Sequence, residues 1–448
     1  MHGVEVTAGS QAAVDAFEEV VLGALTLRGD PVAGLKNVVE GDGGFPLVRS
    51  VLAGLLLVSG ARTGVDGDVR RLVEEAKRVG GTPREVRHTA AAEALLGGQL
   101  RLAAAHWEAC LLDDPLCPMT SRLLHDVYLA LGDAGNLRDS MARVMPRWDA
   151  SMPAYCQMVG LYAFACAETG AFDRAEELAM RNLHMDPSDT WSVHTMAHVF
   201  DHQCRRNEGL RFMREMQDCW EDANLAVVHL QAHWALFSLE DAEFDKAMRR
   251  YDALVRAEPS TCVWDLIDAS QVLWRLELQG NDVGARWEEV ANEWEASFLG
   301  VHASPFADVH MAMALVAAGH DDALVDHMTS MRDFGLRPWL RAVAVSVGAP
   351  LCEGLIAYRT GDYETATEAL LRVQGGLQLL GGTAMDRDVF HQTLAHAATQ
   401  SGSLALARAV LSQRITNRSA SPTAWYHYAG VLGAMGHEEE AAAARDQA

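Results

Sequence analysis

Residues 161–187 read LYAFACAETGAFDRAEELAMRNLHMDP, and this stretch decides the predicted fold. Two small residues, Ala163 and Ala175, lie on either side of Gly170, and Pro187 closes the stretch. Apolar residues recur at intervals of three and four along both halves, which is the spacing of a helix with one buried face. Glycine between the halves is typical of a turn. The stretch therefore predicts two helices that form a hairpin.

The same pattern recurs along the chain. Ala197 follows Ala163 after 34 positions, and Ala232 follows after a further 35. This period, with small residues where paired helices approach, is typical of tetratricopeptide repeats. We therefore predict an all-α, tetratricopeptide-repeat-like solenoid of helical hairpins over residues 1–448. Residues 155–256 are its central, histidine-rich repeats, and residues 265–300 are predicted to be a longer helical pair.

Composition excludes several classes of protein. The 448 residues include 37 Lys+Arg and 61 Asp+Glu, a formal net charge of -24, which argues against a nucleic-acid partner and an anionic membrane surface. Eight cysteines are scattered without a C-x-x-C motif, so we expect reduced thiols. No signal peptide is visible, and the most apolar short run, residues 51–58, is far too short to span a membrane. We expect a soluble, cytoplasmic protein.

The central repeats carry four histidines in register. His194 and His198 are four residues apart, and His229 and His233 repeat that spacing on the equivalent helix of the next repeat. Asp201 lies about one turn beyond His198 on the same face. Equivalent helices of adjacent repeats pack side by side, roughly 8–10 Å apart. We therefore expect four imidazoles and one carboxylate to face a hollow on the concave surface.

Three interpretations of this histidine cluster stay open. The four histidines could bind a divalent transition metal such as zinc or iron. They could instead act as general acids and bases on a small polar molecule, with Asp201 orienting a ring. They could also hydrogen-bond across helices and specify packing, or grip a peptide. The sequence contains no dinucleotide-binding motif, no nucleotide-binding loop and no nucleophilic serine elbow.

Several pieces of the chain, taken together, resemble the tetratricopeptide repeat protein 38 family. They are LHDVYLALGD (residues 124–133), LRDSMARVMPRW (137–148), DTWSVHTMAHVFDHQ (189–203), HLQAHWALFSLE (229–240), DASQVLWRLELQG (268–280), GARW (284–287), PFADVH (305–310) and LGGTAMDRDVFHQTLAHAA (380–398). The resemblance covers most of the chain and implies an α-helical repeat superhelix, but no particular reaction. It points to these family motif positions: His125, Asp126, His194, His198, His229, His233, Asp308 and His310.

Two functions compete. We favour an enzyme that acts on a small polar molecule in the concave groove, of open reaction class. Its predicted catalytic residues are His194, His198, Asp201, His229 and His233. Its predicted substrate-binding residues are His125, Asp126, Trp191, Trp234 and His310. The alternative is a non-catalytic scaffold that docks a protein or peptide partner, and a basic peptide would suit the acidic surface.

Overall fold

The computed structural model describes residues 5–59, 65–333 and 338–448. Within these ranges every regular element is a helix, and neighbouring helices pack as hairpins. The predicted all-α, tetratricopeptide-repeat-like solenoid of helical hairpins is confirmed. The chain divides into two compact units. The first unit consists of residues 1–196, 216–227 and 334–342, and the second consists of residues 197–215, 228–333 and 343–448. One continuous solenoid over residues 1–448 stays a prediction.

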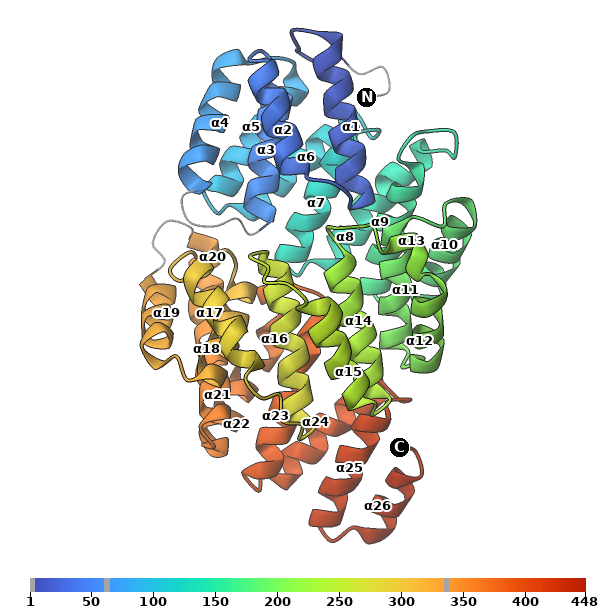
Figure 1. The fold of residues 1–448 in the computed structure, drawn as a ribbon, viewed down its shortest axis with the longest axis vertical. Helices are drawn as coiled ribbons and strands as arrows, with labels where there is room; N and C mark the ends of the chain where they lie inside the picture. The colour runs from blue at the N-terminus through green and yellow to red at the C-terminus, as the bar shows by residue number, and fades with distance from the viewer. Residues whose placement is uncertain (1–4, 60–64, 334–337) are drawn as a thin grey trace. The chain divides into compact units, whose positions relative to one another are not determined.

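The first unit is built from helices that pack against their neighbours in the chain (Figure 1). These helices are α1 (Gln11–Thr26), α2 (Pro31–Gly41), α3 (Pro46–Val58), α4 (Val65–Val79), α5 (Pro83–Leu96), α6 (Leu100–Asp113), α7 (Pro118–Ala130), α8 (Ala134–Val144), α9 (Tyr155–Glu168), α10 (Phe172–Met185) and the short α13 (Gln217–Trp220), with a 3₁₀ turn η1 (Met145–Arg147) after α8. Helix α3 also packs against α5 and α7, and α7 packs against α1 and α9. Phe17, Phe45 and Trp107 are fully buried in its core.

Helices α9 and α10 are the hairpin that the opening stretch predicts. Ala163 and Ala175 are both fully buried where the two helices meet. Gly170 has φ of +78°, and its amide donates to the carbonyl oxygen of Ala167. A left-handed backbone is where glycine is favoured over residues with a Cβ atom. The turn and the close approach of the helices are therefore both encoded locally.

The second unit continues with hairpins, of which α21–α22, α23–α24 and α25–α26 follow one another (Figure 1). Its helices are α12 (Arg206–Glu215), α14 (Val227–Glu240), α15 (Phe244–Arg250), α16 (Val263–Leu278), α17 (Arg286–Phe298), α18 (Pro305–Ala318), α19 (Asp321–Asp333), α21 (Ala349–Arg359), α22 (Tyr363–Val373), α23 (Ala384–Gln400), α24 (Leu404–Asn417), α25 (Pro422–Ala434) and α26 (Glu438–Arg445), with π-helical turns η2 (Tyr251–Val255) and η3 (Ala344–Gly348) and a 3₁₀ turn η4 (Gln374–Leu380). The segment 265–300, predicted to be a longer helical pair, forms α16 and α17. These helices have 16 and 13 residues and are no longer than α23 and α24, which have 17 and 14.

Three helices cross the boundary between the units, α14 only with its first residue, Val227. Helix α11 (Thr190–His202) carries His194 in the first unit and His198 in the second. Helix α20 (Pro338–Val343) is followed directly by η3 and α21. The resulting helical stretch Trp339–Arg359 is long and apolar enough to cross a membrane by length and composition, although 61% of its most apolar window is buried. A buried core helix passes the same test, so this is weak evidence for a span, and the cytoplasmic location stays a prediction.

Side-chain caps fix several helix starts. At α5 the Thr82 hydroxyl accepts the amide of Glu85, whose carboxylate accepts the amide of Thr82. Thr383 and Asp386 form the same reciprocal pair at the start of α23. These bonds satisfy amides that the first turn of a helix leaves without partners. The cap at α23 also places Asp386 beside the histidine cluster described next.

Candidate functional site

Three of the predicted histidines come together inside the second unit. His198 is on α11, and His229 and His233 are on α14. Each offers a ring nitrogen within 4.8 Å of the others. The ring centroids of His198 and His233 lie 4.9 Å apart, and those of His229 and His233 lie 4.5 Å apart. His198 and His233 are buried, whereas the His229 side chain is 31% exposed. We call these three residues the histidine cluster.

A carboxylate that the sequence prediction did not include orients the cluster. Asp268, on α16, accepts the Nδ1–H of His229 at 2.9 Å and is itself buried. On the other side of the ring, Nε2 of His229 lies 3.0 Å from Nε2 of His233. An ionised carboxylate only accepts hydrogen bonds, so it fixes the proton on Nδ1 of His229. Asp268, His229 and His233 therefore form one hydrogen-bonded chain.

Electrostatics distinguishes the two histidines of α14. Burial would lower the pKa of His229, but Asp268 overrides this effect and raises the pKa to about 9. Burial lowers the pKa of His233 well below its ordinary value, and the positive charge on His229 lowers it further. At neutral pH the chain is thus a carboxylate, an imidazolium and a neutral imidazole, with the Nε2–H of His229 donating to His233.

The space beside the cluster is small. A cavity of about 10 Å³ is lined by residues that include His229, His233, Asp268 and Asp386. A water molecule needs about 10–15 Å³ of such volume. The cavity therefore has room for one water or one metal ion and is too small for an organic substrate. This geometry does not support the enzyme that we favoured from the sequence.

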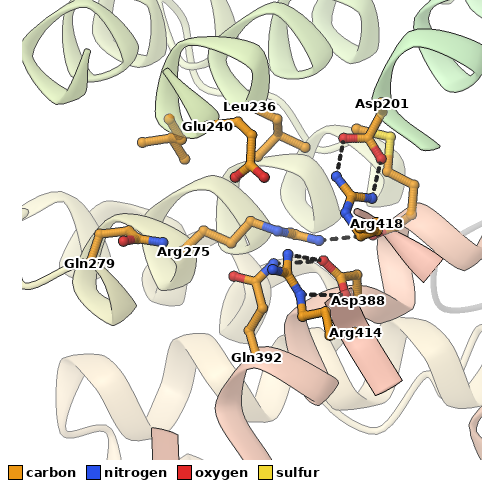
Figure 2. A pocket seen from close by; sticks show the side chains of 11 residues that line it. Asp201, Leu236, Glu240, Arg275, Gln279, Asp388, Gln392, Arg414 and Arg418 are labelled. Atoms are coloured by element: carbon orange, nitrogen blue, oxygen red, sulfur yellow. Dashed lines mark hydrogen bonds and ion pairs between the residues drawn. The ribbon is translucent and has the colours of Figure 1, made fainter. Parts of the chain in front are cut away.

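Asp201 takes part in a different network. Its two carboxylate oxygens accept hydrogen bonds of 2.7 and 3.0 Å from the guanidinium of Arg418. Burial opposes ionisation, but Arg418 outweighs it and lowers the pKa of Asp201. Nearby, Arg414 donates to Asp388 at 2.8 and 3.2 Å. Figure 2 shows that these side chains line one pocket, of about 30 Å³, together with Glu240 and Arg275.

This network changes the role that the sequence suggested for Asp201. Asp201 was predicted to orient a histidine ring, but both of its oxygens are engaged by Arg418, 217 residues later in the chain. The sequence carried no local signal for Arg414 or Arg418, because both lie outside the matched motifs. An ion pair between segments so far apart depends on how the hairpins stack.

Four predicted residues lie in the first unit among aromatic neighbours. The His125 ring is fully buried, 5.4 Å from the ring of Phe164 and 5.3 Å from that of Trp191. Burial lowers the pKa of His125 well below its ordinary value. His194 stacks on Phe164 with ring centroids 4.9 Å apart. The Asp126 carboxylate forms an ion pair with Arg122, one turn earlier on α7. These contacts are those of a packed core.

The remaining two predicted substrate contacts, Trp234 and His310, are also buried in the second unit. The guanidinium of Arg250 lies 3.6 Å from the Trp234 ring centroid. Nδ1 of His310 donates to the carbonyl oxygen of Phe306 at 2.7 Å, and burial lowers the pKa of His310 to about 4. Both side chains are packed in the interior of the unit. Their predicted contact with a substrate stays a prediction.

A second group of ligand-type residues lies around Asp308. His302, Asp308 and His327 are all buried, and each offers a ligand atom within 4.8 Å of the others. His302 is bonded to the Asp308 carboxylate at 3.1 Å and to the Ser330 hydroxyl at 3.0 Å. Nε2 of His327 donates to the backbone oxygen of Asp308 at 2.9 Å. These internal bonds are those of a structural network that joins α18 to α19.

Comparisons with known proteins give only distant similarity. No protein-family model matches the chain. The chain is similar to the human IFIT1 dimer with m7Gppp-AAAA, at 12% identity and a TM-score of 0.42, with 99% of this chain and 95% of that chain covered. Yeast Tom70 gives 15% identity, a TM-score of 0.34, and 97% and 91% coverage. The structure of Naa15/Naa10 bound to HypK-THB gives 13% identity and a TM-score of 0.26, with 98% of this chain and 68% of that chain covered. At these values the similarity carries no argument about family or function.

Proposed function

We propose that this protein is a non-catalytic, tetratricopeptide-repeat-like scaffold that docks a basic segment of a protein partner on its second unit. The observation that carries the proposal is an exposed apolar residue among carboxylates. Val325, on α19, is 64% exposed, and Asp322 and Asp326 beside it are exposed as well. The exposed carboxylates on either side of Val325 in the sequence are complementary in charge to a partner segment that combines basic and apolar residues.

The neighbouring helix extends this acidic surface. Just before α19, His320 approaches Glu295 at 2.8 Å and Glu288 at 3.5 Å, so the carboxylates of α17 lie next to the start of α19. Both glutamates are exposed, at 43% and 60% for Glu295 and Glu288. We call Glu288, Glu295, Asp321, Asp322 and Asp326 the acidic ridge. With a net charge of -24 on the whole chain, long-range attraction would also favour encounter with a basic partner.

Site-specific crosslinking tests this proposal. A photo-crosslinking benzophenone amino acid is placed at Val325, and the intact protein is irradiated in a lysate of its source cells. We expect one predominant partner protein, crosslinked through a segment rich in Lys or Arg. The same amino acid at Leu102, which is 46% exposed on α6, is the matched control. The double variant Asp322→Lys, Asp326→Lys should abolish the crosslink. A crosslink that survives this charge reversal, or none at Val325, refutes the proposal.

A second candidate function, metal binding, is favoured by the geometry of the histidine cluster. Two nitrogen ligands at 2.0–2.1 Å from a tetrahedral zinc ion are about 3.3 Å apart, close to the 3.0 Å between the Nε2 atoms of His229 and His233. The proton between them lies where an ion would bind. Asp268 already holds His229 in the way that carboxylates hold metal-binding histidines. We propose zinc or iron at this position, with His198 as the third ligand.

Metal analysis tests the second candidate. The purified protein is equilibrated with Zn²⁺ or Fe²⁺, freed of loose metal, and its metal content is measured by mass spectrometry. We expect about one ion per chain, and less than a tenth of that in His233→Ala. His437→Ala, which removes a surface histidine at the start of α26, is the matched control and should keep full occupancy. Equal occupancy in both variants, or no stoichiometric binding by the natural chain, refutes this candidate. His194, the fourth predicted ligand, stays a prediction.

A further inference from the structure

The first unit contains a cavity that neither the histidine cluster nor the acidic ridge involves. It has a volume of about 520 Å³ and lies among α1, α3, α5, the start of α7 and the segment before α9. Its walls are mainly hydrocarbon and include these six side chains: Phe17, Val21, Leu25, Leu47, Val51 and Met119. Pockets of 300–1,000 Å³ with apolar walls and a few polar groups are those in which proteins bind small organic molecules.

The buried lining residues His88 and Cys117, which we call the inner end of the cavity, are bonded to polar groups behind the wall. Nδ1 of His88 accepts the indole N–H of Trp107 at 3.1 Å, so Nε2 carries the proton and donates to the Thr120 hydroxyl at 2.6 Å. The Thr120 hydroxyl in turn donates to Sγ of Cys117 at 2.9 Å. Because these polar groups already bond to one another within the protein, the inner end needs no polar group from a ligand. The interior is suited to an apolar chain or ring.

The lining residues Glu18, Glu19 and Leu22, which we call the outer end of the cavity, differ from the inner end in charge. Glu18 and Glu19, on α1, line the cavity, and Leu22 beside them is 46% exposed. Glu18, Leu22 and Leu25 follow the three- and four-residue spacing of one helix face, so this face leads from a carboxylate into the apolar walls. A ligand that matches both ends has an apolar body and a cationic head.

We propose that the first unit binds one molecule of an amphipathic amine, with its apolar body in the cavity and its ammonium group beside Glu18 and Glu19. An alkylammonium is protonated at neutral pH, as the lysine side chain is, with a pKa of about 10.4. The carboxylates would therefore favour an amine over an alcohol of the same length and would disfavour a carboxylic acid. This site is independent of the docking surface and of the histidine cluster, which belong to the second unit.

Calorimetric titration of the intact protein at pH 7 with decylamine, decanol and decanoate tests the proposal. We expect decylamine to bind once per chain, at least threefold more tightly than decanol and at least tenfold more tightly than decanoate. The double variant Glu18→Gln, Glu19→Gln should bring decylamine down to the affinity of decanol and leave decanol unchanged. Equal affinity for the three compounds would refute the preference for an amine, and no binding of any of them would refute the ligand site itself.

Two variants test the position of the ligand. Val51→Trp fills the cavity from α3 and should weaken decylamine binding more than tenfold, but it alters a buried position. Leu22→Trp narrows the outer end from an exposed position, so folding is not challenged, and it should have the same effect. Leu102→Trp, at an equally exposed leucine on α6 outside the cavity, is the matched control. Unchanged binding in Leu22→Trp, or equal loss in Leu102→Trp, places the ligand elsewhere and overturns the proposal.

Discussion

The buried His88 makes the stability of the first unit sensitive to mild acid. Its side chain is fully buried, and its Nδ1 accepts a hydrogen bond from the indole of Trp107. An imidazolium cannot accept that bond, because both of its nitrogens carry hydrogen. Burial lowers the pKa of His88 to about 3, and the charge of Arg84 contributes in the same direction. In the unfolded chain, by contrast, the histidine titrates near 6.5.

The size and sign of the effect follow from these two pKa values. The folded state keeps His88 neutral, so its contribution to stability is complete above pH 6.5 and is lost as the pH falls towards 3. Between pH 7 and pH 5 the unfolded chain gains about 2 kcal/mol from protonation of this one residue, and by pH 3 the loss approaches 4–5 kcal/mol. The variant His88→Asn keeps an acceptor for Trp107 but does not titrate.

Urea unfolding followed by tryptophan fluorescence measures this effect. The free energy of unfolding is determined at pH 7, 6 and 5 for the natural chain, for His88→Asn and for His184→Asn, an exposed control on α10. His88→Asn should be less stable than the natural chain at pH 7, but its free energy of unfolding should fall about 2 kcal/mol less between pH 7 and pH 5. The control should fall as the natural chain does. The reasoning is refuted if all three chains lose the same free energy over this range.

Three further outcomes are expected in the second unit, each checked by urea or thermal unfolding. Arg418→Ala leaves the carboxylate of Asp201, whose side chain is only 11% exposed, without its partner and should cost about 3–5 kcal/mol, whereas Asp201→Asn in the same chain should recover part of that loss. Gly209→Ala would place a Cβ atom 2.8 Å from the ring of Phe237 and should cost about 1–3 kcal/mol; equal stability of the alanine variant would show that the ring moves aside freely. Removing a bound metal with a chelator should lower the melting temperature, and no change would count against a metal in the histidine cluster.

The helices were predictable from the sequence because their signals are local. The three- and four-residue spacing of apolar side chains, a glycine at the turn and small residues at the contact all act within one hairpin. The structure bears this out at Ala163, Gly170 and Ala175. The period of 34–35 residues then places Ala197 and Ala232 in equivalent buried positions. Each of these inferences uses neighbours in the chain or in the next repeat.

The partners of charged residues were not predictable, since they depend on how distant hairpins stack. Asp201 lies 217 residues from Arg418, and nothing near either residue marks the other as its partner. The tendency of a buried carboxylate to acquire a cation is general, but the sequence does not say which cation. The interpretation of Asp201 as the residue that orients a ring rested on its helix alone. The structure pairs Asp201 with Arg418, and its predicted catalytic role stays a prediction.

The histidine cluster combines a feature that the sequence predicts with one that it does not predict. A four-residue spacing on a helix brings His229 close to His233 whatever the rest of the chain does, and the repeat register brings His198 beside them. The charge of the cluster, however, is set by Asp268, which lies 39 residues from His229 on another helix. With Asp268 in place, one imidazole is protonated and its neighbour is neutral. The same pair without that carboxylate would favour two neutral rings, because two buried imidazolium ions repel each other. The chemistry of a local motif is therefore decided by a contact that the motif does not contain.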